Sequence, residues 1–356
     1  MAFTFDADPQ ALIRERTPQF VGLGVPRDTI EQVAPYLKDL WSDGPGGWVH
    51  EWSLAARIAQ RIKDHLLASL LFGIAKYPCL GNAAHKEAYH NQLEAYLRAS
   101  RSFPQHFERH VLSVPYRDQI TRVPVHILRD QRVPGTAPVV MMLGGVDTWK
   151  MDIHNSATYL SKVLHAHVAL VDMPGVGESG VPNAPDGDEV LNGVAEQLRP
   201  IGNGRLGVLA FSFGGLWAVK LALMGRVDVA AAAGACVSSC FERENLKSIP
   251  NGMPGILGNS LFLEAPFPDL SSLASAMAPF SLRSQGLYEW SLSRTPLLLV
   301  NGCDDPYVPQ SDVLDFSSRP ATVARLIPHA THCAAERMSD LMPWILSWLG
   351  PHLQSP

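Results

Sequence analysis

From about residue 105 onward, short apolar runs alternate with stretches whose apolar residues recur every three or four positions. Five of these runs are apolar on both faces: 138–143, 167–171, 206–210, 227–237 and 296–300. This pattern is typical of strands in a parallel sheet that helices cover on both sides. The alternation therefore predicts an α/β fold, in which helices flank a mostly parallel sheet of about eight strands.

The remaining strands and helices of this region follow from similar patterns. Residues 110–116 and 120–128 surround the turn residues Arg117, Asp118 and Gln119, which predicts an antiparallel pair. A last strand is expected at 323–327. Helical spacing of apolar residues predicts helices at 153–165, 190–198, 213–224 and 338–349.

Two other parts of the chain do not fit this alternation. Before residue 105, amphipathic spacing over 51–72 and 83–101 predicts an all-helical segment. We therefore expect a helical unit at 1–104 and a sheet domain at 105–356. The stretch 241–290 fits neither period and is rich in proline, so we expect it to form a lid or a wall of a substrate pocket.

Composition excludes several classes of partner. The 356 residues include 29 Lys and Arg against 34 Asp and Glu, and no basic stretch suggests binding to nucleic acid or to an anionic membrane. No signal-like start and no apolar run of membrane-spanning length is evident, so we expect a cytoplasmic protein. The five cysteines are scattered without a C-x-x-C pair, which indicates reduced thiols rather than disulfides or zinc ligands.

The chain from 206 to 225 has the pattern of a nucleophile elbow centred on Ser212. An apolar strand is followed by Ala210, Ser212 and Gly214, and then by a helical run. Such a turn is so tight that only small residues fit two positions before and after the serine. Ala210 departs mildly from the usual glycine. A serine between small residues also occurs in ordinary turns. Other motifs in the chain must therefore show whether Ser212 is a nucleophile.

A serine nucleophile needs a base that a third group orients, and candidates for both follow Ser212 in the chain. After the strand 296–300, either Asp304 or Asp305 can supply the carboxylate; we favour Asp305 and expect Asp304 to cap the turn. After the last strand we favour His332 over His329, which we expect to be structural. The order Ser, Asp, His is that of the α/β hydrolases. An H-x-x-H metal pair has no evident third ligand, so no metal is expected.

The transition state also requires amide donors for an oxyanion. The Phe213 amide, which follows the nucleophile, is one candidate. Gly144 and Gly145 allow the loop after 138–143 to curl, so that the amide of Val146 or of Asp147 points into the site. The alternative is an ordinary glycine turn in which Asp147 caps the next helix.

A G-x-G-x-x-G pattern at Gly175, Gly177 and Gly180 invites a dinucleotide interpretation. The glycines open no helix, prolines follow at once, and no strand ending in an acidic residue lies about twenty positions later. We therefore expect no bound cofactor. The same residues form D-x-P-G-x-G-x-S, a frequent turn in α/β hydrolases.

Together these motifs resemble the α/β-hydrolase superfamily across 105–356. The elbow, D-x-P-G-x-G-x-S, N-G-x-x-D-x-x-V-P and the terminal histidine loop carry this resemblance. The resemblance is narrowed to one branch of the superfamily by two further features: the loop from Leu143 to Lys150, and the helical N-terminus with Trp48, Glu51 and Trp52. The chain looks like the branch that holds 2,6-dihydroxypseudooxynicotine hydrolase, the fungal yellowish-green polyketide-shortening hydrolases and the fermentation-respiration switch esterases.

This resemblance implies that the helical segment packs over the active site as a cap, and it implies a homodimer. Several members of the branch cleave carbon-carbon bonds next to a ketone. The nicotine-degrading member uses an acidic side chain beyond its nucleophile, for which Glu242 and Glu244 are the candidates here, although plain surface charges fit them better. In the cap, Trp48, Tyr77 and other aromatic residues either hold a flat substrate ring or form the core of a helical bundle.

The expected function is hydrolysis of a small ketone or ester, aromatic or polyketide-derived, through an acyl-enzyme on Ser212. Gly145 and Asp147 are further candidates for contact with this substrate. The first expectation is retro-Claisen cleavage of a carbon-carbon bond. A carboxylesterase and an acyltransferase or cyclase would use the same three residues, and a non-catalytic interaction protein is a more distant alternative.

Overall fold

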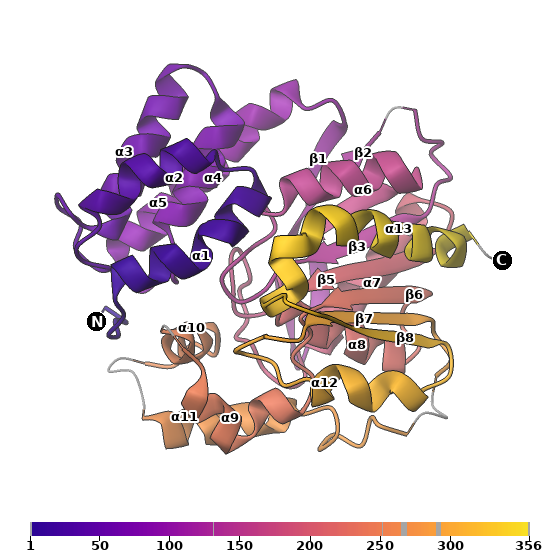
Figure 1. Ribbon diagram of the computed structural model, residues 1–356. Coiled ribbons are helices and arrows are strands. Elements are labelled where there is room, and N and C mark those ends of the chain that lie inside the picture. The colour runs from indigo at the N-terminus through magenta and orange to yellow at the C-terminus, as the bar shows by residue number, and fades with distance from the viewer. Residues whose placement is uncertain (1, 131, 251, 265–268, 290–292, 355–356) are drawn as a thin grey trace.

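The computed structural model describes residues 2–130, 132–250, 252–264, 269–289 and 293–354. Its centre is an eight-stranded sheet in the order β1-β2-β4-β3-β5-β6-β7-β8 (Figure 1). β1 pairs antiparallel with β2, and β2 pairs antiparallel with β4, while every other pair is parallel. This sheet confirms the predicted α/β fold. Its strands are β1 (His106–Tyr116), β2 (Gln119–Arg129), β3 (Val139–Leu143), β4 (His167–Val171), β5 (Leu206–Phe211), β6 (Val229–Ala233), β7 (Leu297–Gly302) and β8 (Thr322–Ile327).

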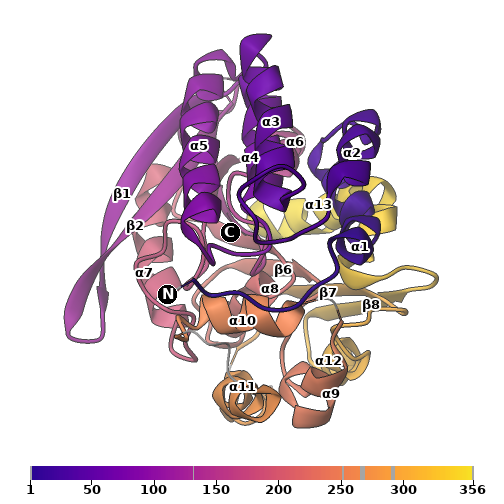
Figure 2. The same ribbon diagram turned by 90° about the vertical axis from the view of Figure 1, so that its left-hand side faces the viewer.

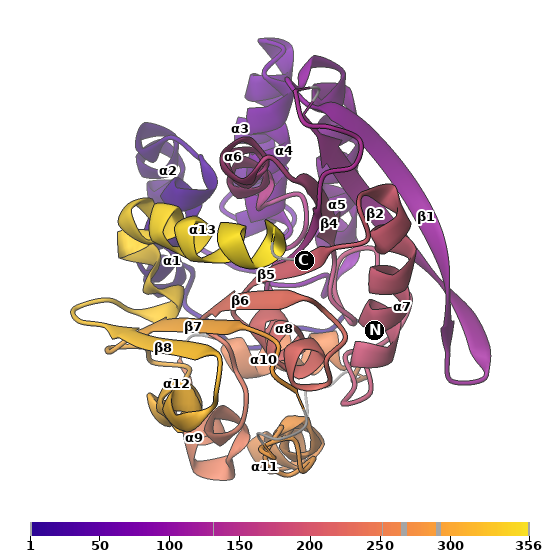
Figure 3. The same ribbon diagram turned by 90° about the vertical axis from the view of Figure 1, so that its right-hand side faces the viewer.

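Helices cover both faces of the sheet (Figure 3). Successive side chains of a strand point to opposite faces, and all five residues of β3 are buried. Val140 and Met142 share a core with α6 (His154–Leu164) and α13 (Met338–Gln354). Val139 and Met141 belong to the core on the other face, with α7 (Asp188–Leu198) and α8 (Gly214–Leu223). This two-sided burial explains the continuous apolar runs in the sequence.

The N-terminal helices form a group of their own beside the sheet (Figures 1 and 2). The stretch 51–72 that reads as one amphipathic pattern contains two helices. α3 ends before Lys63, which has a left-handed φ of 65°, and the Asp64 side chain then caps α4 by accepting from the Leu67 amide. The helices are α1 (Pro9–Leu23), α2 (Arg27–Val33), α3 (Trp48–Arg61), α4 (His65–Ala75) and α5 (Ala83–Ala99).

The described residues of 241–290 include three α-helices that gather below the N-terminal group (Figure 1). They are α9 (Arg243–Ser248), α10 (Met253–Ser260) and α11 (Leu270–Met277), and α12 (Ser311–Leu314) follows β7. The expected last residue of this stretch, Trp290, lies outside the described residues. Short 3-10 helices complete the fold: η1 (Ala34–Tyr36), η2 (Ser100–Ser102), η3 (Arg199–Ile201), η4 (Ser239–Phe241), η5 (Ala278–Phe280), η6 (Asp315–Ser318) and η7 (His332–Arg337).

The strand predicted at 227–237 is too long, because β6 ends at Ala233. Gly234 takes a left-handed φ of 69°, which turns the chain out of the sheet. A side chain at this position would meet Cys333 and His332. The glycine therefore both ends the strand and makes room for the loop after β8. In the described part of the chain, no helix is long and apolar enough to cross a bilayer.

The packing of α13 yields a test of the fold. Leu346 is fully buried against the sheet, whereas Leu314 on α12 is 50% exposed. We expect Leu346→Ala to lower the free energy of unfolding by about 2–5 kcal/mol, because a cavity remains where the side chain was. Leu314→Ala is the control and should change it by less than about 0.5 kcal/mol. Urea unfolding followed by circular dichroism measures both, and equal effects would contradict the placement of α13.

Candidate active site

The turn from β5 to α8 places Ser212 in a sharp corner of the chain. Ser212 has a left-handed φ of 54°, and its amide donates to the Ala233 carbonyl at 2.8 Å. A side chain at Gly214 would collide with the Gly144 carbonyl. A Cβ added at Gly145 would lie 2.8 Å from the Ser212 Cβ. The predicted strand-turn-helix geometry is therefore present, and glycines allow the chain to pass close to the serine.

The side chains of Ser212, His332 and Asp305 form one hydrogen-bonded chain. His332 Nε2 lies 2.8 Å from Ser212 Oγ, and His332 Nδ1 lies 2.6 Å from Asp305 Oδ2. The Asp305 side chain is only 1% exposed. Asn301, at the end of β7, donates to Asp305 Oδ2 at 2.7 Å and accepts from the Cys333 amide at 3.0 Å. Asn301 therefore connects the loop that carries Asp305 to the loop that carries His332.

Burial and charge act against each other on both ionisable groups. Burial alone would raise the pKa of Asp305, but His332 and the donated hydrogen bonds outweigh it and lower the pKa below its usual value. Burial alone would lower the pKa of His332, but Cys333 and the Asp305 carboxylate raise it well above the usual value. The Asp305 carboxylate therefore stabilises a positive charge on His332 when the imidazole takes up a proton.

Asp304 and His329, the alternatives to Asp305 and His332, do not take part in this hydrogen-bonded chain. Asp304 is exposed, and the expectation that it caps the turn is wrong, since the Tyr307 and Val308 amides donate to Asp305 Oδ1. His329 is also exposed, at a left-handed φ of 55°, rather than a buried structural histidine. Among the described residues, no group of three or more His, Cys, Asp or Glu side chains is arranged to hold a metal ion.

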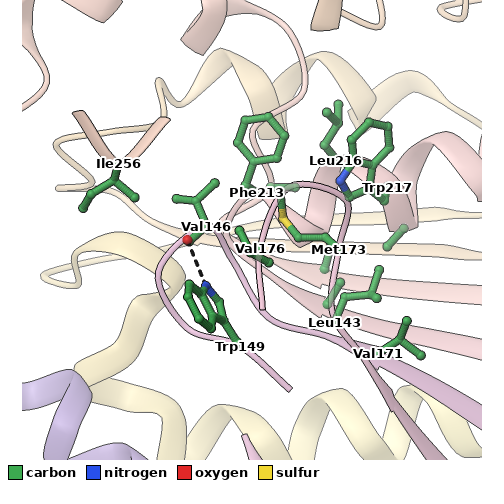
Figure 4. Packing of buried hydrophobic residues seen from close by; sticks show 14 of the residues in the cluster. Leu143, Val146, Trp149, Val171, Met173, Val176, Phe213, Leu216, Trp217 and Ile256 are labelled. Atoms are coloured by element: carbon green, nitrogen blue, oxygen red, sulfur yellow. Dashed lines mark hydrogen bonds between the residues drawn. The ribbon is translucent and has the colours of Figure 1, made fainter. Parts of the chain in front are cut away.

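The loop after β3 lies against the elbow, with Val146 close to Phe213 (Figure 4). Within the described residues, the Val146 and Phe213 amides have no protein acceptor. The Trp149 indole donates to the Val146 carbonyl at 3.0 Å, and the Gly145 amide donates to the Thr148 carbonyl at 2.9 Å. These bonds fix the curl of the loop.

Asp147 does not cap a helix, because Ile153 is the N-cap of α6 and offers no side-chain bond. Its carboxylate instead faces the N-terminal helices. Arg16 Nη1 lies 3.1 Å from Asp147 Oδ2, and the Thr148 hydroxyl donates to Oδ1 at 3.1 Å. The helix-capping alternative is therefore wrong, and the carboxylate points away from the pocket beside Ser212, which it does not line.

A small apolar pocket opens beside Ser212. None of the described residues that line it carries a carboxylate, ammonium or guanidinium group. The buried Asp312 carboxylate holds the pocket loop by accepting from the amides of residues 237–240. The lining residues are Val146, Ser212, Phe213, Cys236, Cys240, Phe241, Leu246, Ile249, Met253, Leu257, Tyr307 and His332. Such a lining suits an uncharged, apolar group bound next to the serine.

Four candidate substrate-contact residues lie outside this pocket. Glu242 is exposed, and Glu244 is 81% exposed and pairs with Lys247, so both are surface charges. Trp48 is fully buried, with its indole donating to the Ile74 carbonyl, and belongs to the core of the helical group. Tyr77 is also buried and packs against Arg16. These positions fit the surface-charge interpretation of Glu242 and Glu244 and the bundle-core interpretation of Trp48 and Tyr77.

The link between Asp305 and His332 yields a test. Asp305→Asn should lower the pKa of His332, because it removes the negative charge that stabilises the imidazolium. An NMR titration of the His332 imidazole measures this shift. Asp304→Asn is the matched control, since Asp304 is the exposed neighbour, and it should leave the titration almost unchanged. A larger shift in the control would contradict the observed pairing.

Comparisons with known proteins place the chain in a family. The family described as esterase FrsA-like matches residues 41–334. Esterase FrsA of Vibrio parahaemolyticus is 27% identical over 289 residues, which span 75% of this chain and 67% of that protein. Esterase FrsA of Photobacterium profundum is 25% identical over 332 residues, or 86% of this chain and 76% of that protein.

Two solved structures share the fold over almost the whole length. AbyA5 aligns with a TM-score of 0.76 at 21% identity and covers 90% of this chain and 93% of its own. The 2,6-dihydroxy-pseudo-oxynicotine hydrolase aligns with a TM-score of 0.72 at 19% identity and covers 95% of each chain. The family match spans most of the chain and includes the elbow. This chain therefore belongs to the FrsA-like esterase family and is an α/β-hydrolase enzyme.

Proposed function

We propose that the protein is a serine hydrolase in which Ser212 is the nucleophile, His332 the base and Asp305 the group that orients the base. The hydrogen bonds of His332 carry this proposal: Nε2 lies 2.8 Å from Ser212 Oγ, and Nδ1 lies 2.6 Å from Asp305 Oδ2. The serine itself has a left-handed backbone conformation. Such a chain lets the imidazole accept the hydroxyl proton as the oxygen attacks. The uncharged pocket beside it is suited to the acyl part of a substrate.

The reaction follows from these positions. His332 Nε2 takes the proton of Ser212 Oγ, which forms a bond to the substrate carbonyl carbon. The carbonyl electrons move to oxygen, where the Phe213 and Val146 amides donate to the oxyanion. Collapse breaks the bond to the leaving group, which receives the proton from His332, and an acyl-serine remains. Water then attacks the acyl-serine, again with His332 as base, and releases a carboxylic acid.

For the bond that breaks, we propose a carbon-carbon bond next to a ketone, in an aromatic or polyketide-derived compound. A carbon leaving group is tolerable only if a neighbouring carbonyl or electron-rich ring delocalises its electrons, which restricts the substrate to β-diketones or aryl ketones. The resemblance to the carbon-carbon hydrolases of this branch supports the proposal. The fold match to the pseudo-oxynicotine hydrolase is consistent with it because it includes the N-terminal helices.

A second candidate is a carboxylesterase. The family description and the curated relatives are named esterases, which is the specific observation in its favour. The same acyl-enzyme would form, and only the leaving group would differ.

The proposed domain roles follow from the contacts around the pocket. We propose that residues 1–104 act as a cap, because Arg16 and Gln19 of α1 contact the Asp147 and Thr148 side chains of the loop after β3. Phe241, Leu246, Ile249, Met253 and Leu257 support a role for 241–290 as a pocket wall.

Removal of the Ser212 hydroxyl tests the nucleophile. We expect Ser212→Ala to lower kcat by about 10⁴-fold or more, because the remaining groups cannot form an acyl-enzyme. Ser275→Ala, on the exposed side of α11, is the control and should keep the activity of the unchanged protein. Steady-state kinetics on 1-phenylbutane-1,3-dione and on a p-nitrophenyl ester measure both variants. Activity that survives in Ser212→Ala would refute the proposal.

The two substrates also separate the two candidate functions. A carbon-carbon hydrolase should have the higher kcat/KM on the diketone, and a carboxylesterase should have it on the ester. Turnover in ¹⁸O-labelled water should place one labelled oxygen in the acid product. An unlabelled product would contradict hydrolysis and indicate transfer of the acyl group to another nucleophile.

A further inference from the structure

Arg16 is a buried arginine of α1 that lies next to the site but does not line the pocket. We propose that Arg16 is a positioning residue that joins the loop of Val146 to the loop of Asp305. This inference rests on the proposed function. It assigns a part in the reaction to a residue almost two hundred positions before Ser212 in the chain.

The first contact of Arg16 is with the loop after β3. Arg16 Nη1 lies 3.1 Å from Asp147 Oδ2, one residue after Val146. Gln19, one turn further along α1, accepts from Arg16 and donates to the Thr148 hydroxyl at 2.5 Å. These contacts fix the plane of the Asp147 carboxylate. They also anchor the chain one residue after Val146, whose own amide lies in the preceding peptide, between Gly145 and Val146.

The second contact is with the loop of the acid. Arg16 Nη2 donates to the Tyr307 hydroxyl at 3.4 Å, and its guanidinium lies 5.6 Å from the centre of the Tyr307 ring. The same ring meets the His332 ring edge-on at 5.2 Å. The Tyr307 amide donates to Asp305 at 2.7 Å. Arg16 therefore supports the tyrosine that packs on the base and hydrogen-bonds the acid.

The charge of Arg16 matters as well as its shape. Asp147 is only 8% exposed, and a buried carboxylate without a partner is costly. If a neutral residue replaced Arg16, this negative charge would be unpaired one residue after Val146 and would oppose negative charge that develops near the Val146 amide. The guanidinium also lies 5.5 Å from the centre of the Tyr77 ring. A lysine has a single ammonium group and no planar fork, so it cannot bond the Asp147 carboxylate and the Tyr307 hydroxyl in the same way.

Two substitutions at this position test the proposal. We expect Arg16→Gln to lower kcat by about 10- to 100-fold with KM changed less than about threefold, because the donors are present but misplaced. Arg16→Lys should lie between this variant and the unchanged protein. Arg14→Gln, at an exposed position of the same helix, is the control and should match the unchanged protein. Rates are expressed per Ser212 site titrated with a fluorophosphonate, so that unfolded protein does not count.

A trifluoromethyl ketone distinguishes the proposed positioning role of Arg16 from a purely structural role. This inhibitor forms a reversible hemiketal oxyanion with a serine. Its affinity should fall in Arg16→Gln by about the same factor as kcat/KM. Asp147→Asn should cost less in the Arg16→Gln background than in the unchanged protein, because both changes act on one contact. Unchanged inhibitor affinity and kcat, or fully multiplicative effects, would overturn the proposal. Loss of stability with normal kinetics would do the same. Activity in Ser212→Ala would refute the proposed function instead.

Discussion

The site depends on the close approach of two chain segments at Ser212. The serine has a left-handed backbone, which is unfavourable for a residue with a side chain and persists only where the surroundings hold it. Gly145 packs against the serine side chain, and Gly214 packs against the Gly144 carbonyl. A side chain at any of these glycines would force the loop after β3 away from the elbow. Without this contact, Val146 and Phe213 could not line the same pocket.

Three buried cations form ion pairs in and around the loop after β3. Lys76 pairs with Asp152 at 3.0 Å, and that carboxylate also accepts from the Trp149 amide at 2.7 Å. Lys150 pairs with Asp172 of the D-x-P-G-x-G-x-S turn and with Glu178 at 2.8 Å. Arg16 pairs with Asp147. Buried ion pairs contribute little net stability, but removal of one partner is strongly destabilising. Their role here is to specify one loop conformation.

Much of the fold and the order of the candidate residues could be predicted, because both are local in the chain. The sheet strands are continuous apolar runs, and Ser212, Asp305 and His332 each follow a strand. The close contacts could not be predicted in the same way. Arg16 is one charged residue on an amphipathic helix, and only the packing of α1 brings it to Asp147. Asn301 had a local signal, since it opens N-G-x-x-D, but its bond to Asp305 depends on the loop after β8.

The substrate-contact roles considered for Glu242, Glu244, Trp48 and Tyr77 also depend on packing between segments that are distant in the chain. Glu242 and Glu244 were placed near the site by distance along the chain, yet the 3-10 turn η4 and helix α9 direct both to the surface. Trp48 and Tyr77 are aromatic residues of a helical group, where packing among neighbours buried them in its core. The preference for Asp305 over Asp304 came from its place in the turn after β7, and it is Asp305 that contacts His332.

The position of the reactive serine is the central claim, and covalent labelling tests it most directly. A fluorophosphonate reacts with a serine whose hydroxyl is activated by a neighbouring base. Peptide mass spectrometry of the labelled protein should find one adduct per chain, on Ser212. An adduct on another serine, or no adduct on protein that is folded and active, would contradict the account.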